Sequence, residues 1–149
     1  PDELIRKIQD QNTFNQGFMT TELLAAALLD MELHNLTDTA SLDVVAFEKA
    51  VMDKLGLIPE IAPRYRATYF NHILSGYAAG YYSYLWAEVL DADAFEAFKE
   101  HGLFDKNTAD SFRRNVLEKG GTEDPMALYK AFRGAEPSLE PLLKNRGLK

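Results

Sequence analysis

Phenol and imidazole side chains gather in one short stretch of this sequence, YFNHILSGYAAGYYSYLW, which covers residues 69–86. The stretch holds five of the seven tyrosines, one of the three histidines and the only tryptophan. A phenol keeps its proton at neutral pH and offers a directional O–H. Two phenols and an imidazole that converge on one point can stabilise a carbonyl oxygen that is becoming an oxyanion. The residue types therefore favour chemistry at a carbonyl group.

The spacing of these residues suggests how they converge. Tyr77, Tyr81 and Tyr84 stand at i, i+4 and i+7, so a helix starting near Gly76 would place all three phenols on one face. His72 precedes the glycine, where a loop could fold it back toward them. A second interpretation fits the same spacing and is commoner: a half-buried structural face in which each hydroxyl bonds to water or to a backbone carbonyl. Spacing alone leaves both interpretations open.

The order of the residues adds a resemblance to a known family. The segment HILSGYAAGYYSYLW resembles the glycine- and tyrosine-rich segment of the thimet oligopeptidase and peptidyl-dipeptidase family of zinc metallopeptidases, and within it most of all the dipeptidyl carboxypeptidase branch. The flanking segments are similar to that family as well: FNQGFMTTELLAAALLDMELH, PRYRATYFNH, AEVLDADAFEAFKEHGLFD, LEKGGTEDPMALYKAFRG and LLKNRGL. The resemblance thus covers nearly the whole chain.

The resemblance implies an activity and a set of roles. In the family, the residues that match His72, Tyr77 and Tyr84 act at the transition state of peptide hydrolysis. The tyrosine that matches Tyr81 lines the substrate cleft, and Gly76 fits a loop that closely approaches a substrate backbone. We therefore expect a short peptide as substrate and zinc as the cofactor of the full-length enzyme. Dipeptide release from C-termini is the favoured reaction, while cleavage inside oligopeptides stays open.

The metal-binding motif of that family is missing from these residues. No His-Glu-x-x-His occurs, and His34, His72 and His101 are too far apart in sequence to form its i, i+4 histidine pair. Asp30 lies one turn before His34, but we expect a solvated pair there rather than a metal site. We therefore expect this chain to be the C-terminal part of the catalytic region of a larger helical peptidase. It should bind no zinc, be inactive alone and have the remainder of the peptidase as its partner.

A second function belongs to another class of protein. The tyrosine-rich face could grip a peptide or a protein without chemistry, as part of a stand-alone helical binding module. A coding sequence that continues upstream into His-Glu-x-x-His would favour the peptidase. A start codon just before Pro1 would favour the binding module.

Composition excludes several other classes. The net charge of −7 and the isoelectric point near 4.9 argue against nucleic-acid binding, because no basic patch is available to neutralise phosphates. No apolar run approaches the roughly 18 residues of a membrane span. The absence of cysteine leaves the redox compartment open, and the cytoplasm is the expected location.

The hydrophobic pattern predicts an all-α fold, because no segment shows sustained period-two alternation. The length of 149 residues is sufficient for a single helical domain over residues 1–149. Caps and apolar periodicity predict seven helices, over residues 1–14, 22–36, 43–55, 78–101, about 107–119, 125–133 and 138–145. Thr20 or Thr21 is the expected cap of the second helix. The acids at 91 and 93 could kink the fourth helix, over residues 78–101, or cap a further helix.

The connection over residues 56–68 contains the arginines Arg64 and Arg66. An arginine can clamp a substrate carboxylate with two hydrogen bonds. A surface or core-bracing ion pair is the commoner role, and we do not count either residue among the predicted site residues.

Overall fold

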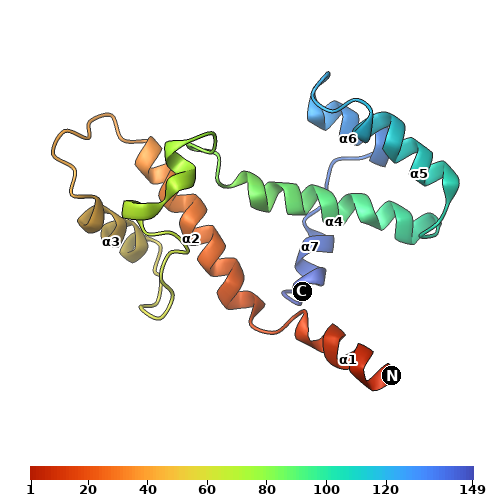
Figure 1. The fold of residues 1–149 in the computed structure, drawn as a ribbon, viewed down its shortest axis with the longest axis horizontal. Coiled ribbons are helices and arrows are strands. Elements are labelled where there is room, and N and C mark those ends of the chain that lie inside the picture. Colours follow the sequence, from red (N-terminus) through yellow and green to blue (C-terminus); the bar gives the residue numbers. More distant parts are fainter. The chain divides into compact units, whose positions relative to one another are not determined.

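The computed structural model describes residues 1–149 and contains helices and no strand, which confirms the all-α prediction (Figure 1). None of its helices combines the length and apolar character needed to cross a membrane. The helical segments are α1 (Asp2–Gln11), α2 (Gln16–His34), α3 (Val44–Lys54), the 3₁₀ turns η1 (Ala67–Tyr69) and η2 (Asn71–Leu74), α4 (Ser83–His101), α5 (Lys106–Phe112), the π-helical turn η3 (Arg113–Leu117), α6 (Pro125–Arg133) and α7 (Glu140–Asn145).

Contacts within the chain divide it into two compact units, Pro1–Trp86 and Ala87–Lys149. We refer to them as the N-terminal and the C-terminal unit. The single domain expected from length stays a prediction, because this division does not test whether the two units fold or act separately.

Helix α2 is the centre of the N-terminal unit. Its alanine run, Ala25 to Ala27, is almost completely buried, so neighbouring segments approach the helix closely on two sides. On one side Leu23 packs with Phe70 and Tyr81, and on the other Leu29 packs with residues of α3, the helix beside it in Figure 1.

The start of α2 differs from the prediction. The helix begins at Gln16 rather than near residue 22, after Asn15 in a left-handed conformation with φ of 58°. Thr21 caps nothing, because its hydroxyl donates to the carbonyl of Gly17 at 2.7 Å inside the helix. Asparagine adopts left-handed φ readily, so the turn at Asn15 allows a helix to begin without a side-chain cap.

Helix α3 follows the prediction closely. The Asp43 side chain accepts hydrogen bonds from the backbone N–H groups of Val45 and Ala46, at 3.0 Å each, as a helix N-cap does. Gly56, two residues after the last helical residue, has a φ of 69°, which favours glycine at the end of a helix.

Residues 75–82 form turns, so the helix expected to start between residues 76 and 78 begins only at Ser83. The reason is tertiary. The buried carboxylate of Asp30 accepts hydrogen bonds from the backbone N–H groups of Ala79 and Tyr81, and Ala79 has a left-handed φ of 54°. A left-handed residue interrupts a right-handed helix, so the helical i, i+4, i+7 face predicted for the tyrosines is wrong.

In the C-terminal unit, α4 continues without a break through Asp91 and Asp93, so no kink or second start occurs there. The cap of α5 is Asp105, not Asn107 or Thr108: its carboxylate accepts from the Thr108 N–H at 2.7 Å and from the Thr108 hydroxyl at 2.9 Å. These bonds hold the pKa of Asp105 below its usual range. Asp105 satisfies the free N–H groups of the helix start two residues earlier than expected.

Helix α6 forms as predicted. Asp124 caps it through the Ala127 N–H at 2.8 Å, Pro125 occupies the first turn, and Gly134 ends it with a φ of 80°. Helix α7 is shorter than expected and starts at Glu140.

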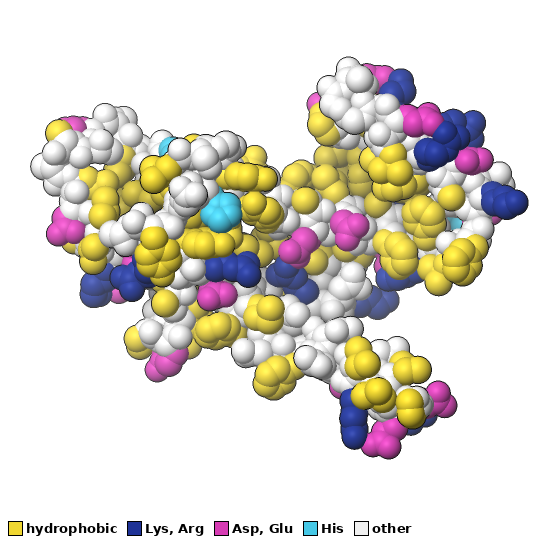
Figure 2. All heavy atoms as spheres, viewed as in Figure 1, with side chains coloured by type: hydrophobic (Ala, Val, Ile, Leu, Met, Phe, Trp, Pro, Cys, Tyr) yellow, Lys and Arg dark blue, Asp and Glu magenta, His cyan; other side chains and the backbone are white.

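Helix α1 buries none of its residues. Leu4, Ile5 and Ile8 form an apolar stripe in which each side chain is more than half exposed, and Figure 2 shows hydrophobic side chains gathered along this helix. Within this chain nothing covers this stripe.

Candidate functional site

The rings of the tyrosine-rich stretch surround one imidazole. The His72 ring centroid lies 5.2 Å from that of Tyr81, 6.0 Å from that of Tyr77 and 6.1 Å from that of Tyr84. Tyr65 from the connection before the stretch and Phe70 from the stretch itself complete the group. We call this group the His72 cluster and define it as Tyr65, Phe70, His72, Tyr77, Tyr81 and Tyr84. The structure thus brings the predicted histidine and all three predicted tyrosines together.

Tyr77 and Tyr84 form a stacked pair at the surface. Their ring centroids are 5.2 Å apart with an interplanar angle of 17°. Both side chains are exposed, at 42% for Tyr77 and 39% for Tyr84. The hydrogen bond with Tyr77 raises the pKa of Tyr84 above its ordinary value of 10.0, and partial burial adds to this effect. The Tyr84 hydroxyl therefore stays protonated at neutral pH, and both phenol side chains are exposed.

Tyr81 has a different environment from these two phenols. Its side chain is only 3% exposed and packs edge-on against Phe70 in the core of the N-terminal unit. Burial raises the pKa of Tyr81, and the Arg64 guanidinium, which hydrogen-bonds to the Tyr81 hydroxyl, opposes this shift. The structural interpretation of tyrosines at this spacing thus fits Tyr81, whereas Tyr77 and Tyr84 have exposed phenols. Contact of Tyr81 with substrate stays a prediction.

The imidazole of His72 has one nitrogen without a partner. Nδ1 is buried and makes no hydrogen bond, and it is the only ring nitrogen of the chain in this state. A buried N–H that lacks an acceptor is costlier and rarer than a buried lone pair that lacks a donor. The neutral ring is therefore more stable with its proton on Nε2. This tautomer makes Nε2 a hydrogen-bond donor.

Gly76 lies in open space on the loop between η2 and the stacked pair. A Cβ atom added at this position would meet no atom within 4 Å, and its φ is not in the left-handed region. The left-handed residue of the loop is Ala79 instead. Within this chain nothing requires glycine at position 76, so the predicted close approach of a substrate backbone remains a prediction.

The buried Asp30 anchors the loop that carries Ala79 and Tyr81, and the sequence did not indicate it as a site residue. It is 0% exposed, and it accepts the Ala79 N–H at Oδ1 and the Tyr81 N–H at Oδ2, each at 2.9 Å. His34 Nδ1 lies 2.8 Å from Oδ1. The solvated Asp30–His34 pair expected from the sequence is therefore wrong for the carboxylate. A single aspartate in the apolar run AALLD was the signal for a buried anchor.

The two arginines before the cluster have separate roles. Arg66 forms an ion pair with Glu48, which is 3% exposed and also accepts the Ala67 N–H at 2.6 Å. The core-bracing ion pair is thus confirmed for Arg66. Arg64 instead contacts the Tyr81 hydroxyl beside the His72 cluster, and its guanidinium is exposed.

The acidic and imidazole groups of this chain do not fit a zinc site. No three side chains of the kinds that ligate metals come together. Asp30 is bonded to two backbone amides and to His34, and His101 Nδ1 is 2.9 Å from the carbonyl oxygen of Ala97. Asp30, His34 and His101 are therefore already engaged within the chain, and no further ligating side chains gather around His72.

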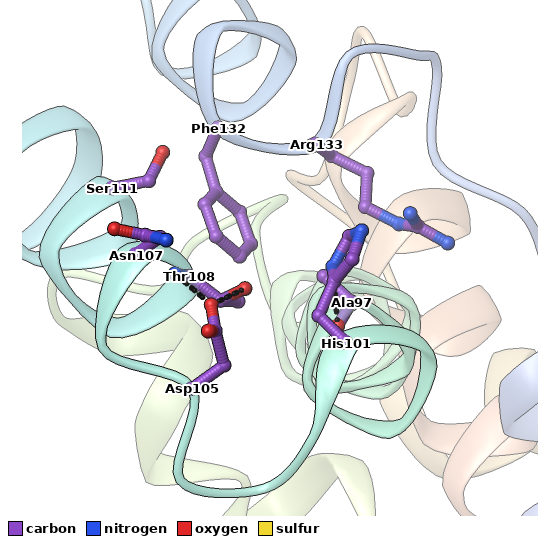
Figure 3. Close-up of a pocket in the computed structure, with 8 residues that line it drawn as sticks. All are labelled: Ala97, His101, Asp105, Asn107, Thr108, Ser111, Phe132 and Arg133. Carbon is purple, nitrogen blue, oxygen red and sulfur yellow. Dashed lines mark hydrogen bonds between the residues drawn. The ribbon is translucent and has the colours of Figure 1, made fainter.

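A hollow of about 440 Å³ in the C-terminal unit is also lined by polar side chains (Figure 3). Several of its polar groups are already bonded: Asp105 to Thr108, His101 to the Ala97 carbonyl, and Arg133 to Glu100 at 2.7 and 3.0 Å, while the buried Arg133 Nε makes no hydrogen bond. The hollow contains none of the predicted site residues. The His72 cluster is therefore the candidate functional site.

Comparison with known proteins identifies the family of this helical chain, whose candidate site has two phenols at its surface. The model of Peptidase family M3 matches residues 1–148, and the chain belongs to this family. The resemblance identified in the sequence is thereby confirmed.

Individual relatives carry two kinds of name. The chain is 43% identical to "Dipeptidyl carboxypeptidase" of Escherichia coli (strain K12), over 99% of this chain and 22% of that protein. It is 39% identical to "Oligopeptidase A" of Salmonella typhimurium, over 100% of this chain and 22% of that protein. It is 40% identical to "Probable cytosolic oligopeptidase A" of Arabidopsis thaliana, over 99% and 22%. The chain thus spans about a fifth of the length of these relatives.

Proposed function

We propose that this chain supplies substrate-binding and transition-state-stabilising residues to a peptidase that cleaves short peptides. The single observation that carries the proposal is the stacked, exposed pair of Tyr77 and Tyr84 beside the imidazole of His72. Membership of Peptidase family M3 supports the reaction class.

The phenol pair suits an oxyanion. When a peptide carbonyl is attacked, its oxygen gains negative charge, and preorganised O–H donors stabilise that charge more than they stabilise the neutral ground state. One hydroxyl of the pair donates to the other, so the accepting phenol keeps its own O–H free for the substrate. Donation into that hydroxyl polarises it and strengthens the bond it makes. In this proposal Tyr77 and Tyr84 bind the oxyanion.

His72 has a separate role in this proposal. With its proton on Nε2, the ring donates a hydrogen bond to a second carbonyl of the peptide, next to the scissile bond. Gly76 completes the surface along which the peptide backbone lies, and Tyr81, whose side chain is buried, lies behind that surface. The buried ring of Tyr81 supports His72 from behind, with centroids 5.2 Å apart.

The remaining parts of the proposal concern the whole protein. Zinc, which the family resemblance implies, would be held by residues outside this sequence, because the side chains here do not fit it. Residues 1–149 would act together as the C-terminal part of the catalytic region, with the rest of the peptidase as partner. A cytoplasmic location is proposed from the printed name of the "cytosolic" relative, although another relative is named "organellar".

Release of dipeptides from C-termini is the reaction we favour. The higher identity to the protein named "Dipeptidyl carboxypeptidase" supports it. Arg64 supports it as well, since its exposed guanidinium beside the His72 cluster could bind a terminal carboxylate.

The test uses the whole protein that carries this chain. Peptides with a free C-terminus and the same peptides with a C-terminal amide are compared as substrates. Dipeptide release predicts products two residues long and a large loss of kcat/KM for the amide. Cleavage of both forms at equal rates would contradict it and favour internal cleavage.

The catalytic assignment is tested with the double variant Tyr77→Phe, Tyr84→Phe. We expect kcat to fall by at least about 100-fold while KM changes little, because the hydroxyls act mainly in the transition state. An unchanged kcat would leave the pair with a packing role and favour a binding module without catalysis.

A further inference from the structure

Asp30 is the most completely buried acidic side chain of the chain, and both of its oxygens face the loop that carries the tyrosines. It is 0% exposed, and it accepts the Ala79 N–H and the Tyr81 N–H at 2.9 Å each. The donors lie 49 and 51 residues further along the chain. A carboxylate that accepts one backbone N–H at each oxygen fixes both the position and the orientation of that backbone.

From this geometry we propose that Asp30 is the positioning residue of the phenol pair. It acts on the peptide units between Tyr77 and Tyr84 and so determines where the two rings meet. The inference rests on the function proposed above, because it assumes that the pair acts on a substrate. Asp30 itself is buried and contacts only the loop backbone and His34 among polar groups.

The conformation of Ala79 shows why an anchor is needed. Its φ of 54° lies in the left-handed region, which residues with a side chain rarely adopt. The turn has few other constraints: the Gly80 N–H donates to the Tyr77 carbonyl at 2.9 Å, and the Ser83 N–H to the Gly80 carbonyl at 3.0 Å. Without the Asp30 carboxylate, the Ala79 and Tyr81 amides would lose their acceptors and the strained turn would relax.

The consequence of relaxation falls on the phenols rather than on the core. Tyr77 precedes the turn and Tyr84 follows it, so a change at Ala79 alters the separation of the two rings. Their mutual hydrogen bond and 5.2 Å stacking depend on that separation. Tyr81 remains held by its own packing against Phe70.

The test is Asp30→Asn in the whole protein. Asparagine has the same shape, but it accepts at one oxygen only and places its NH₂ group against the other backbone N–H. We expect kcat to fall by about 10- to 100-fold with less than about a threefold change in KM, because displacement of a catalytic group by about 1 Å has effects of this size.

A double-mutant cycle distinguishes positioning of the phenol pair by Asp30 from a purely structural role of this residue. If Asp30 acts through the phenol pair, the fold-loss caused by Asp30→Asn shrinks to about threefold or less in the Tyr84→Phe background. Full multiplication of the two losses would overturn the inference. In that case Tyr84→Phe alone would still lower kcat and leave the proposed function standing. An unchanged kcat in Tyr84→Phe would instead remove the proposed function itself.

Glu48→Gln is the matched control. Glu48 is also buried in the N-terminal unit and also anchors a backbone N–H, that of Ala67, which lies outside the turn at Ala79. We expect its kcat to stay within about threefold of the unmodified protein. Equal losses of kcat in Asp30→Asn and Glu48→Gln would show a general effect of lost stability and overturn the inference.

If Asp30→Asn does not fold, His34→Ala replaces it. His34 lies near the surface, and its Nδ1 is 2.8 Å from Asp30 Oδ1, so its removal loosens the carboxylate without removing it. We expect a loss of kcat of about two- to fivefold that again shrinks in the Tyr84→Phe background. A kcat equal to that of the unmodified protein would overturn the inference.

Discussion

Each unit of the molecule contains an aromatic cluster beside a buried carboxylate, and the two clusters differ in what their polar groups do. In the N-terminal unit, the Asp30 carboxylate binds backbone N–H groups, and the phenols of Tyr77 and Tyr84 remain exposed. In the C-terminal unit, the Asp93 carboxylate accepts the hydroxyl of Tyr129, which is itself buried. The aromatic cluster of this unit consists of phenylalanines in contact with one another, which have no hydroxyl: Phe95, Phe98, Phe112 and Phe132.

The comparison separates a structural cluster from one that can act on a ligand. Tyrosine beside aspartate is often taken as a sign of chemistry, yet in the C-terminal unit the pair stabilises the fold. Desolvation by burial and the bond to Asp93 raise the pKa of Tyr129 far above its ordinary value. A phenol is available for chemistry when the carboxylate beside it binds the backbone instead of the hydroxyl. Four predictions follow from this difference, beginning with the largest effect.

The largest effect separates the two clusters by activity. In the whole protein, Tyr84→Phe should lower kcat by about 100-fold, because it removes a donor aimed at the oxyanion. Tyr129→Phe should change kcat by less than about threefold, because its hydroxyl is bound to Asp93. Steady-state kinetics on the same short peptide measure both. Comparable losses in the two variants would abolish the distinction.

The second effect concerns stability, on which Tyr129→Phe should have a larger effect than Tyr84→Phe. Tyr129→Phe should lower the free energy of unfolding by about 1–3 kcal/mol, because the buried Asp93 carboxylate loses a donor. Tyr84→Phe should change it by no more than about 0.5 kcal/mol, because that phenol is exposed. Urea unfolding of residues 1–149, followed by circular dichroism, measures both. A larger loss in Tyr84→Phe would contradict the assignment of the two clusters.

The third effect is a dependence on alkaline pH. The pKa of Tyr84 is raised above 10.0, so its phenol keeps its proton until the pH exceeds that value. Up to that pH, kcat should not fall through loss of this hydrogen-bond donor. The pKa of Tyr129 in the folded state is also raised above 10.0. Its contribution to stability is therefore complete below the unfolded pKa and is lost as pH rises through the folded one.

Phenolate absorbance in the near ultraviolet measures this third effect. Tyr84→Phe should remove a titration step above pH 10, whereas Tyr129→Phe should remove none before alkaline unfolding. Ionisation of Tyr129 in the folded protein below pH 10 would show that its hydroxyl is not held by Asp93.

The smallest effect is an expected absence of zinc binding by residues 1–149. Neither cluster offers three metal-ligating side chains, so residues 1–149 should bind far less than one zinc per chain. Elemental analysis after equilibration with zinc and gel filtration measures the content, with a His34→Ala variant as the control for surface binding. One tightly held zinc per chain that is lost on substitution of His72 would show a metal site in the N-terminal unit. It would contradict the assignment of the metal to residues outside this sequence.

The sequence predictions succeed where a local structure depends on residues close together in the chain, and they fail where it depends on residues far apart. The helices starting near residues 43 and 125 were predicted where they occur because the hydrogen bonds that cap them, from Asp43 and Asp124, lie within three residues. The start of α4 was not, because the backbone between residues 75 and 82 is held by Asp30, about 50 residues away. A helical pattern cannot reveal such an anchor.

The candidate site shows the same division. The sequence indicated which residues would gather, and His72 does lie among the three tyrosines. The reason was wrong, since a turn and not a helical face brings Tyr77 beside Tyr84. Burial of Tyr81 and exposure of its two neighbours depend on packing against Phe70, which local spacing does not encode.

The left-handed turn at Ala79 also restricts which amino acids can occupy that position. A β-branched side chain there would clash with the adjoining peptide group, whereas glycine, alanine, asparagine and aspartate tolerate this conformation. Natural variants that keep the turn should therefore have one of these few residues at position 79. Valine, isoleucine or threonine at that position would mark a protein whose loop follows another path.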